Sequence, residues 1–329
     1  MEPMVSICTT TYQHALYIEK ALDSFLMQKT TFPFEILIHD DVSTDGTIEI
    51  LKRYAEKYPE IVKPLFEEEN QYSKGVPINE TFNFPRAKGK YIALCEGDDC
   101  WLDENKLQAQ VDYMEAHPDC TFCFTNGTIT DVSGNAPDRP FVPYYEEERP
   151  WFSEEDRSYE LGEMTRLSFV PTASFLFPRA VWEKLQEEYS RKMCEHGDLK
   201  MRLYFTSEGY GRYIHMNSCL YRQNVAGSAF QVWRKESAEK TARRAATVSE
   251  MLHDLDERTG GKYMQEMQPL LDRYLFVELW NTTAKKPLQN PELRRVFRAL
   301  PLKQRLTWRL KRALPRPLID GVKRILKKG

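Results

Sequence analysis

The stretch VSICTTTY, at positions 5–12, decides the class of fold. It opens with residues typical of a buried strand and ends in threonines that begin a turn. Apolar residues then recur at helical spacing over 18–25, and a second strand pattern, EILIHDD, follows at 35–41. Strand, helix and strand in this order predict a βαβ unit whose helix covers one face of the sheet.

The same alternation continues outward along the chain. A helical face follows Asp45, and apolar strand patterns occur at 61–66, 91–95 and 120–125. We therefore expect an α/β fold with a mainly parallel central sheet. Residues 126–160 are rich in Pro, Gly and acid without periodicity, and we expect a loop or insertion there.

Regular structure is expected to return after residue 170. The sequence predicts a strand at 173–177, a helix at 179–189 and a strand around 213–216, and beyond about 230 all patterns are helical. We therefore divide the chain into a sheet domain at 1–228 and a helical C-terminal region at 229–329.

The net charge of −3 conceals an uneven distribution along the 329 residues. From Arg294 onward there are 13 basic residues and one acid, Asp320, so the body is acidic and the end is basic. No stretch approaches the ~20 consecutive apolar residues of a membrane-spanning helix. The first strand pattern follows Met4 without an apolar signal region. We therefore expect a cytoplasmic protein.

The seven cysteines are odd in number and scattered through apolar runs, as Cys8, Cys95 and Cys219 show. This pattern indicates reduced core residues, not a disulfide framework. Cys120 and Cys123 form a C-x-x-C pair, but no second ligand pair at zinc-site spacing accompanies it. We expect both thiols to pack in a strand.

Three of the predicted strands end in polar residues. TTTY at 9–12 follows the first strand, DD at 40–41 the second, and EGDD at 96–99 the fourth. In an open α/β sheet, ligands bind beyond the carboxyl ends of the strands. Two acidic pairs in one crevice would repel each other, so a divalent cation such as Mg²⁺ or Mn²⁺, with a diphosphate completing its shell, is the expected occupant. The alternative is that these carboxylates cap helices or lie in solvated loops.

These motifs resemble those of family-two glycosyltransferases. The resemblance rests on VSICTTTY, on DDVSTDGT at 40–47 and on GKYIA at 89–93 running into EGDD, and it covers roughly residues 4–225. It implies a Rossmann-like GT-A fold, followed here by the helical C-terminal region. It also implies transfer, with inversion, of a sugar from a nucleotide donor that is usually a uridine diphosphate sugar.

The resemblance also implies a donor site. In it Thr9 and Tyr12 line a uracil pocket, Asp40 accepts a hydrogen bond from the base and Asp41 supports the loop. The complete set of implied donor-binding residues is Thr9, Thr11, Tyr12, Asp40, Asp41, Glu96, Asp98 and Arg222.

Glu96 and Asp98 occupy the family's D-x-D positions, where the first residue contacts the ribose or the metal shell and the second binds the metal. Here the first acid is Glu, and Asp99 adds a third carboxylate. The division of metal contacts between Asp98 and Asp99 therefore stays open, with Mn²⁺ or Mg²⁺ as the expected cofactor.

EHGDL, at 195–199, resembles the segment that holds the family's catalytic base. Asp198 is the expected base, and His196 is the alternative because it occupies the usual Asp position in one alignment. YRQN, at 221–224, resembles a loop that closes over the diphosphate, where Arg222 would neutralise phosphate charge. Relatives often carry His in place of Asn224, which makes a metal contact by Asn224 doubtful.

The C-terminal end has a basic amphipathic pattern. Leucine recurs every four residues, and the pattern repeats after Pro315 and Pro317. The apolar positions are Leu302, Leu306, Leu310, Leu314, Leu318, Ile319, Val322, Ile325 and Leu326, with Lys and Arg between them. We expect this tail to attach the protein to an anionic membrane surface. The alternative is a helical pair packed on the domain with a solvated basic face.

Taken together, we expect an inverting, metal-dependent enzyme that transfers a sugar from a UDP-sugar to the hydroxyl of a saccharide or lipid-linked saccharide. The expected setting is synthesis of a bacterial capsule, exopolysaccharide or O-antigen, on the inner face of the cell membrane. The alternative is a non-catalytic protein of this fold that binds glycans or nucleotide sugars. A dehydrogenase would need G-x-G-x-x-G after the first strand, which is absent. Nothing indicates a nucleic-acid partner.

Overall fold

The computed structural model describes residues 2–141, 152, 154–167, 169–191 and 194–313. Within them a ten-stranded sheet has the order β3-β2-β1-β4-β9-β6-β10-β5, with β7 beside β6 and β8 beside β10. The strands are β1 (Val5–Thr11), β2 (Phe34–Asp40), β3 (Val62–Phe66), β4 (Tyr91–Leu94), β5 (Cys100–Trp101), β6 (Cys120–Asp131), β7 (Arg139–Pro140), β8 (Arg157–Tyr159), β9 (Leu176–Pro178) and β10 (Tyr210–Gln223).

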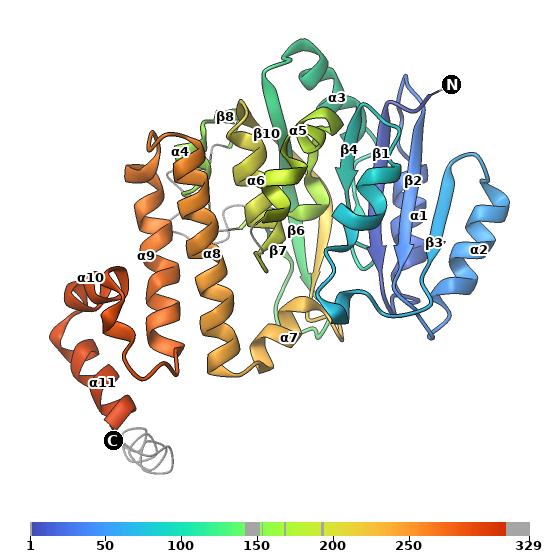
Figure 1. The fold of residues 1–329 in the computed structure, drawn as a ribbon. Coiled ribbons are helices and arrows are strands. Elements are labelled where there is room, and N and C mark those ends of the chain that lie inside the picture. The colour runs from blue at the N-terminus through green and yellow to red at the C-terminus, as the bar shows by residue number, and fades with distance from the viewer. Residues whose placement is uncertain (1, 142–151, 153, 168, 192–193, 314–329) are drawn as a thin grey trace.

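Helices cover both faces of this sheet (Figure 1). The α-helices are α1 (Ile18–Leu26), α2 (Thr47–Lys57), α3 (Lys106–Ala116), α4 (Leu161–Met164), α5 (Arg179–Arg191), α6 (Gly197–Thr206), α7 (Ala229–Lys235), α8 (Ala238–Arg258), α9 (Met264–Asn281), α10 (Pro291–Ala299) and α11 (Leu302–Ala313). The α/β fold and the helical C-terminal region are confirmed.

The sheet is mixed. β3, β2, β1 and β4 are parallel, whereas β9 runs antiparallel between β4 and β6, and β6 and β10 are parallel again. In the parallel block Cys8 lies opposite Leu37 on one side and Leu94 on the other. The three strands therefore end at the same edge, as the sequence predicted.

Alternate residues of each strand enter different cores. Val5 and Ile7 belong to the hydrophobic cluster that includes residues of α1 and α3. Cys8 belongs to a second cluster, which includes residues of α5, α6, α8 and α9. Side chains point to opposite faces of a strand in turn, so an unbroken apolar run is what a sheet covered on both sides requires.

Two expectations differ from the structure. The region expected to be a loop at 126–160 contains, in its described part, the end of β6 as well as β7 and β8, because long β10 pairs with β6 as far as Asp131. The strand expected at 173–177 is a short turn followed by β9. Cys120 and Cys123 are free and buried in β6, as expected.

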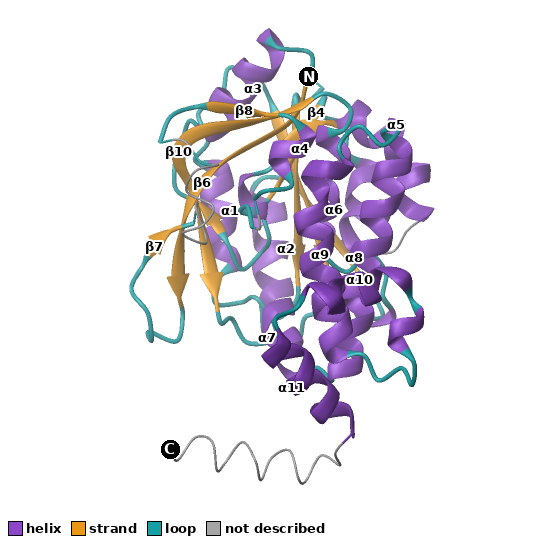
Figure 2. Ribbon diagram, turned by 90° about the vertical axis from the view of Figure 1, so that its left-hand side faces the viewer, coloured by secondary structure: helices purple, strands orange, loops and turns teal. Residues whose placement is uncertain are grey.

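The helical region shares its core with the sheet. α8 and α9 run side by side next to α6 (Figures 1 and 2), and their buried residues form one cluster with those of β4, β6 and α6. The Tyr204 hydroxyl of α6 donates a hydrogen bond to Asp254 of α8. The division at residue 228 stays a prediction, and the core continues across it.

One side of α11 packs on α9 and α10 through Trp308. Trp308 is 6% exposed, packs on Phe297 with ring centroids 5.0 Å apart, and donates its indole N–H to the Leu279 carbonyl at 2.8 Å. Tail positions from Leu314 onward lie outside the described residues. In the part of the chain that is described, no helix combines the length and apolar character needed to cross a membrane.

Candidate active site

The ends of β1, β2 and β4 meet as the sequence predicted. The Gly97 N–H, in the turn after β4, donates to the Thr10 carbonyl at 2.9 Å, and the Asp41 N–H donates to the Thr11 carbonyl at 3.0 Å. A Cβ atom on Gly97 would lie only 2.9 Å from the Thr11 side chain. A side chain at this position would therefore separate the strand ends.

The loops after β1 and β2 are tied together side by side. The Gln13 N–H donates to Ser43 Oγ at 2.9 Å, and the His14 N–H donates to Thr47 Oγ1 at 3.0 Å. Gln13 and Val42 have positive φ angles of 59° and 70°. A positive φ angle costs a non-glycine residue free energy, and residues with such strained backbones cluster at binding and active sites.

The two aspartates after β2 are enclosed. Asp40 accepts hydrogen bonds from the N–H and hydroxyl of Ser43, and burial raises its pKa. Asp41 accepts from the N–H groups of Gln71 and Tyr72 at 2.7 and 3.0 Å. Both carboxyls therefore shape the loop, and the expected hydrogen bond from a nucleobase to Asp40 stays a prediction.

The β1 end offers groups of two kinds. The hydroxyls of Thr9 and Thr11 are buried and have no hydrogen-bond partner in the described part of the chain. Tyr12, by contrast, is 46% exposed. An exposed ring beside the strand ends suits stacking on a planar base, whereas Thr9 and Thr11 lie beneath the surface.

The acidic turn brings together three carboxyl groups, and burial opposes the ionisation of two of them. Burial, followed by the charges of Asp98 and Asp198, raises the pKa of Glu96 to about 7. One carboxyl oxygen of Glu96 is enclosed without a hydrogen-bond partner among the described residues. Burial, with the charges of Asp98 and Glu96, also raises the pKa of Asp99 well above its ordinary value. Ionising all three carboxyl groups of this turn therefore costs free energy, and a bound cation would reduce that cost.

Arg222 lies directly against this turn. Its guanidinium donates to the Asp98 carbonyl at 2.5 Å, and its backbone N–H donates to Asp99 Oδ1 at 2.9 Å. The Asp99 side chain is 2% exposed, and its hydrogen bond with the Arg222 N–H joins the turn to β10. Asp98 keeps part of its side chain exposed.

His14 is a residue that sequence reasoning missed. Its Nε2 lies 3.8 Å from Asp98 Oδ2, and its Nδ1 is enclosed without a hydrogen-bond partner among the described residues. Burial lowers its pKa. The available signal was its place two residues after Tyr12, in the turn that closes on the acidic residues.

Asn224 is engaged elsewhere. Its amide nitrogen donates to Asp131 Oδ1 at 2.8 Å, and its amide oxygen accepts from Gln231 at 2.9 Å. Its φ angle of 67° is the third positive value at a strand end. The amide therefore holds the loop after β10.

Asp198 is the second residue of α6, where the helix N-terminus favours a carboxylate. Its charge contributes to the raised pKa values of both Glu96 and Tyr221, so it lies close enough to the acidic turn for their charges to interact. His196 instead accepts a hydrogen bond at Nε2 from Arg244, 3.2 Å away. The two candidates for the base thus have different surroundings.

The described residues hold no ready-made group of three His, Cys, Asp or Glu side chains able to bind a metal. Mg²⁺ and Mn²⁺ are commonly held by one or two carboxylates together with phosphate oxygens. The partly exposed Asp98, beside the uncompensated Glu96, fits an ion that arrives with a diphosphate. Asp99 fits less well, because it is buried and bonded to the backbone of β10.

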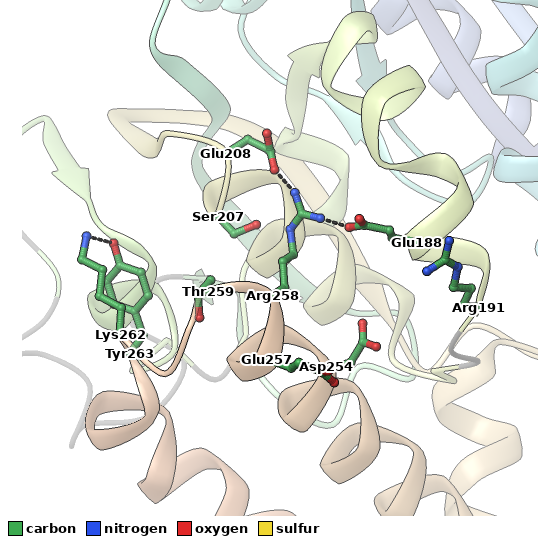
Figure 3. A pocket seen from close by; sticks show the side chains of 10 residues that line it. All are labelled: Glu188, Arg191, Ser207, Glu208, Asp254, Glu257, Arg258, Thr259, Lys262 and Tyr263. Atoms are coloured by element: carbon green, nitrogen blue, oxygen red, sulfur yellow. Dashed lines mark hydrogen bonds and ion pairs between the residues drawn. The ribbon is translucent and has the colours of Figure 1, made fainter.

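One cavity lies away from the strand ends. It has a volume of ≈ 610 Å³ and lies between the C-terminal parts of α5, α6 and α8 (Figure 3). At its centre Arg258 forms ion pairs with both Glu188 and Glu208. Ser207, which lines this cavity, follows Asp198 by nine residues, and nine residues correspond to ~13 Å along a helix axis. Because the Arg258 charge is already compensated, the strand ends remain the better candidate for chemistry.

Known proteins are similar to this chain over the region that contains the strand ends. The family described as glycosyl transferase family 2 matches residues 6–182, which include the strand ends. An uncharacterized protein of Mycobacterium tuberculosis is 42% identical over 139 residues, covering 42% of this chain. That match spans only 39% of the relative's length. A putative teichuronic acid biosynthesis glycosyltransferase of Bacillus subtilis is 27% identical over 240 residues, covering 73% of this chain and 86% of the relative.

Solved structures share the fold. S. aureus TarS residues 1–349, in complex with UDP, has a TM-score of 0.54 and 16% identity, covering 95% of this chain and 87% of that one. A mannosyltransferase from Pyrobaculum calidifontis, in complex with GDP-Man and Mn²⁺, has a TM-score of 0.54 and 19% identity, covering 98% and 84%. The GT-A type of fold is thereby confirmed.

Proposed function

The chain belongs to glycosyl transferase family 2, and from this premise we propose that it transfers a sugar, with inversion, from a nucleotide diphosphate donor to an acceptor hydroxyl. The observation that carries the proposal is that the charges of Asp98 and Asp198 both act on Glu96, in the turn beyond the strand ends. Asp98, with Arg222 against it, suits the diphosphate, and Asp198 suits the acceptor. A leaving-group side and a base side are what a single displacement requires.

The chemistry follows from these positions. Asp198 takes the proton of the acceptor hydroxyl, the oxygen bonds to the anomeric carbon, and the bond from that carbon to the diphosphate breaks on the opposite face. A divalent ion, bound by Asp98 and the diphosphate, would add positive charge beside the leaving group. Arg222 holds the turn and carries its own positive charge there.

The donor is proposed to be a UDP-sugar. Tyr12 supplies an exposed ring for the base, and TarS, a structural neighbour, is described in complex with UDP. The Pyrobaculum neighbour is in complex with GDP-Man, so GDP is the competitor to exclude. Isothermal titration with UDP and GDP, each with Mn²⁺, decides between them.

The acceptor is proposed to be a saccharide or lipid-linked saccharide of a bacterial cell-surface polymer. Support comes from the Bacillus subtilis relative, whose description places it in teichuronic acid biosynthesis. We also propose that the enzyme works at an anionic membrane surface. In α11 the side opposite Trp308 exposes Leu302, Leu306 and Leu310 (64, 49 and 58%) among five basic residues and no acid.

The test separates binding from chemistry. Wild type should release nucleotide diphosphate from one donor of a nucleotide-sugar panel, and only with Mn²⁺ or Mg²⁺. Asp198→Asn should bind donor and metal as the wild type does but lower turnover by about 10²-fold, the scale expected for loss of a general base. If no donor binds or reacts, the protein is not a transferase; if Asp198→Asn is fully active, another group is the base.

A further inference from the structure

His196 lies where the helical region contacts the base-bearing loop. Its ring is 5.0 Å from that of Trp233 on α7 and 5.4 Å from that of Tyr274 on α9. Its carbonyl accepts the Lys200 N–H at 3.0 Å in the first turn of α6. Two helices of the C-terminal region therefore fix the residue that precedes Gly197 and Asp198.

Arg244 on α8 is the third contact and the only charged one of these three. Its guanidinium donates to His196 Nε2 at 3.2 Å, forms an ion pair with Glu236, and stacks over the Trp233 ring at 4.4 Å. The side chains of Arg244 and Glu236 are 12% and 2% exposed. A second acid, Glu195, lies 4.0 Å from Arg244 Nε. A buried arginine thus joins α8 to the base-bearing loop.

The direction of this hydrogen bond fixes the state of His196. A guanidinium can only donate, so Nε2 must accept, and the proton of the neutral ring must be on Nδ1. Burial lowers the pKa of His196; the Asp198 charge opposes this shift and the Arg244 charge adds to it. A ring in this state has no lone pair left to take a proton from an acceptor. His196 is thus unsuited to be the base.

We propose that Arg244 and His196 are a positioning pair: α8 uses them to hold the loop at 194–197, and thereby to keep Asp198, in the first turn of α6, directed toward the acidic turn. This rests on the proposed function, because it assigns the pair a purpose in the transfer step. In this role both residues act through the position of Asp198 and need no contact with substrate. Misplacing a reacting group by about 1 Å can lower a rate by about 10²-fold, so support at this distance matters to catalysis.

The decisive variants compare His196→Gln with His196→Ala. The Oε1 atom of glutamine can occupy the place of Nε2 and accept from Arg244, yet an amide is no base at neutral pH. A positioning residue predicts turnover within about threefold of wild type for His196→Gln and a loss of about 10-fold or more for His196→Ala. The donor KM and the affinity for UDP with Mn²⁺ should change little in either variant, which a general loss of structure would not allow.

Arg244 is tested in a way that avoids a lone buried charge. Arg244→Met with Glu236→Gln removes both charges of the buried pair and should lower kcat by about 10-fold or more at nearly constant donor KM. The control is Arg243→Ala on the same helix, whose side chain is 74% exposed and forms an ion pair along the helix with Glu239. Its kcat should equal that of wild type.

The outcomes separate this proposal from the function on which it rests. Equal loss of turnover in His196→Gln and His196→Ala, with donor binding intact, would overturn the positioning role and make His196 a participant in proton transfer. A wild-type kcat in the double variant Arg244→Met with Glu236→Gln would contradict the positioning role of Arg244. An inactive wild type that binds no donor would instead contradict the proposed function.

Discussion

Asp98 is the residue on which metal-dependent donor binding is expected to depend. Its carboxylate is the partly exposed acid of the turn, whereas Asp99 is bonded to the backbone of Arg222. Asp98→Asn should therefore remove the Mn²⁺-dependent part of UDP affinity while the melting temperature stays close to wild type. Calorimetry with and without Mn²⁺ measures this. Unchanged affinity in Asp98→Asn, with loss in Asp99→Asn, would move the ligand to Asp99.

Lys106 at the start of α3 makes stability depend on pH. Its ammonium is buried, donates to Gln110 at 2.7 Å and lies 4.3 Å from the centre of the Trp101 ring. Burial lowers its pKa to about 8. Between this value and the ordinary value near 10.5, the unfolded chain binds a proton that the folded chain does not, so stability rises with pH.

Lys106→Met should remove this dependence. The free energy of unfolding of wild type, relative to that of the variant, should rise by up to about 3 kcal/mol between pH 7.5 and pH 10. Urea unfolding of both proteins at several pH values gives the two free energies. Their difference removes the contribution of groups that titrate alike in both proteins. Parallel curves would show that Lys106 titrates normally.

At the scale of elements, the site depends on the contact between β1 and the turn after β4. Gly97→Ala would place a Cβ atom 2.9 Å from the Thr11 side chain and 3.0 Å from His14 Nδ1. Because strands in a packed sheet yield little, we expect the turn to shift and donor affinity to fall about 10-fold or more. Thermal shift with UDP and Mn²⁺ gives the readout. Wild-type affinity in Gly97→Ala would mean that the turn moves without consequence for the donor.

The α11 helix is the element on which membrane attachment is tested. Exchanging Leu302, Leu306 and Leu310 for glutamine should abolish sedimentation of the full chain with phosphatidylglycerol vesicles at low salt, since both apolar area and basic charge are needed. Gln304 and Thr307, also exposed on α11, are changed to alanine as the matched control and should leave sedimentation intact. Equal binding to neutral phosphatidylcholine, or none by wild type, would contradict the membrane proposal.

For the whole molecule, the shared core predicts that the two regions do not fold separately. Residues of α8 and α9 such as Leu252, Leu255 and Leu275 are buried in one cluster with Phe175 and Phe205. Nine buried apolar side chains of α8 and α9 belong to this cluster. At about 1.5–3 kcal/mol each, their burial contributes about 14–27 kcal/mol, which matches or exceeds the ~5–15 kcal/mol stability of a typical domain.

A fragment ending at residue 228 should therefore lack a cooperative unfolding transition. Near-UV circular dichroism and urea unfolding compare it with the full chain. A sharp transition in the fragment would show that the sheet, with α1 to α6, is stable alone. The shared core also explains how contacts from α8 can reach the loop at 194–197.

The sequence alone determined the strand ends and their chemistry. Apolar runs followed by TTTY, DD and EGDD predicted parallel strands with polar ends, and the structure brings these ends within hydrogen-bond distance. This succeeded because strand alternation and turn residues are local, and parallel strands connected by helices must end at one edge. The basic, leucine-rich pattern of α11 was visible for the same reason.

The tertiary structure alone decided how the individual acids and bases are held. His14 lies against Asp98, Asp99 bonds to Arg222 across 123 positions, and Arg244 reaches His196 across 48. No periodicity records such contacts, because burial and partners at long sequence separation arise only when helices and strands pack. Those surroundings, and not the residue type, decide whether a carboxyl or an imidazole is free to accept a proton.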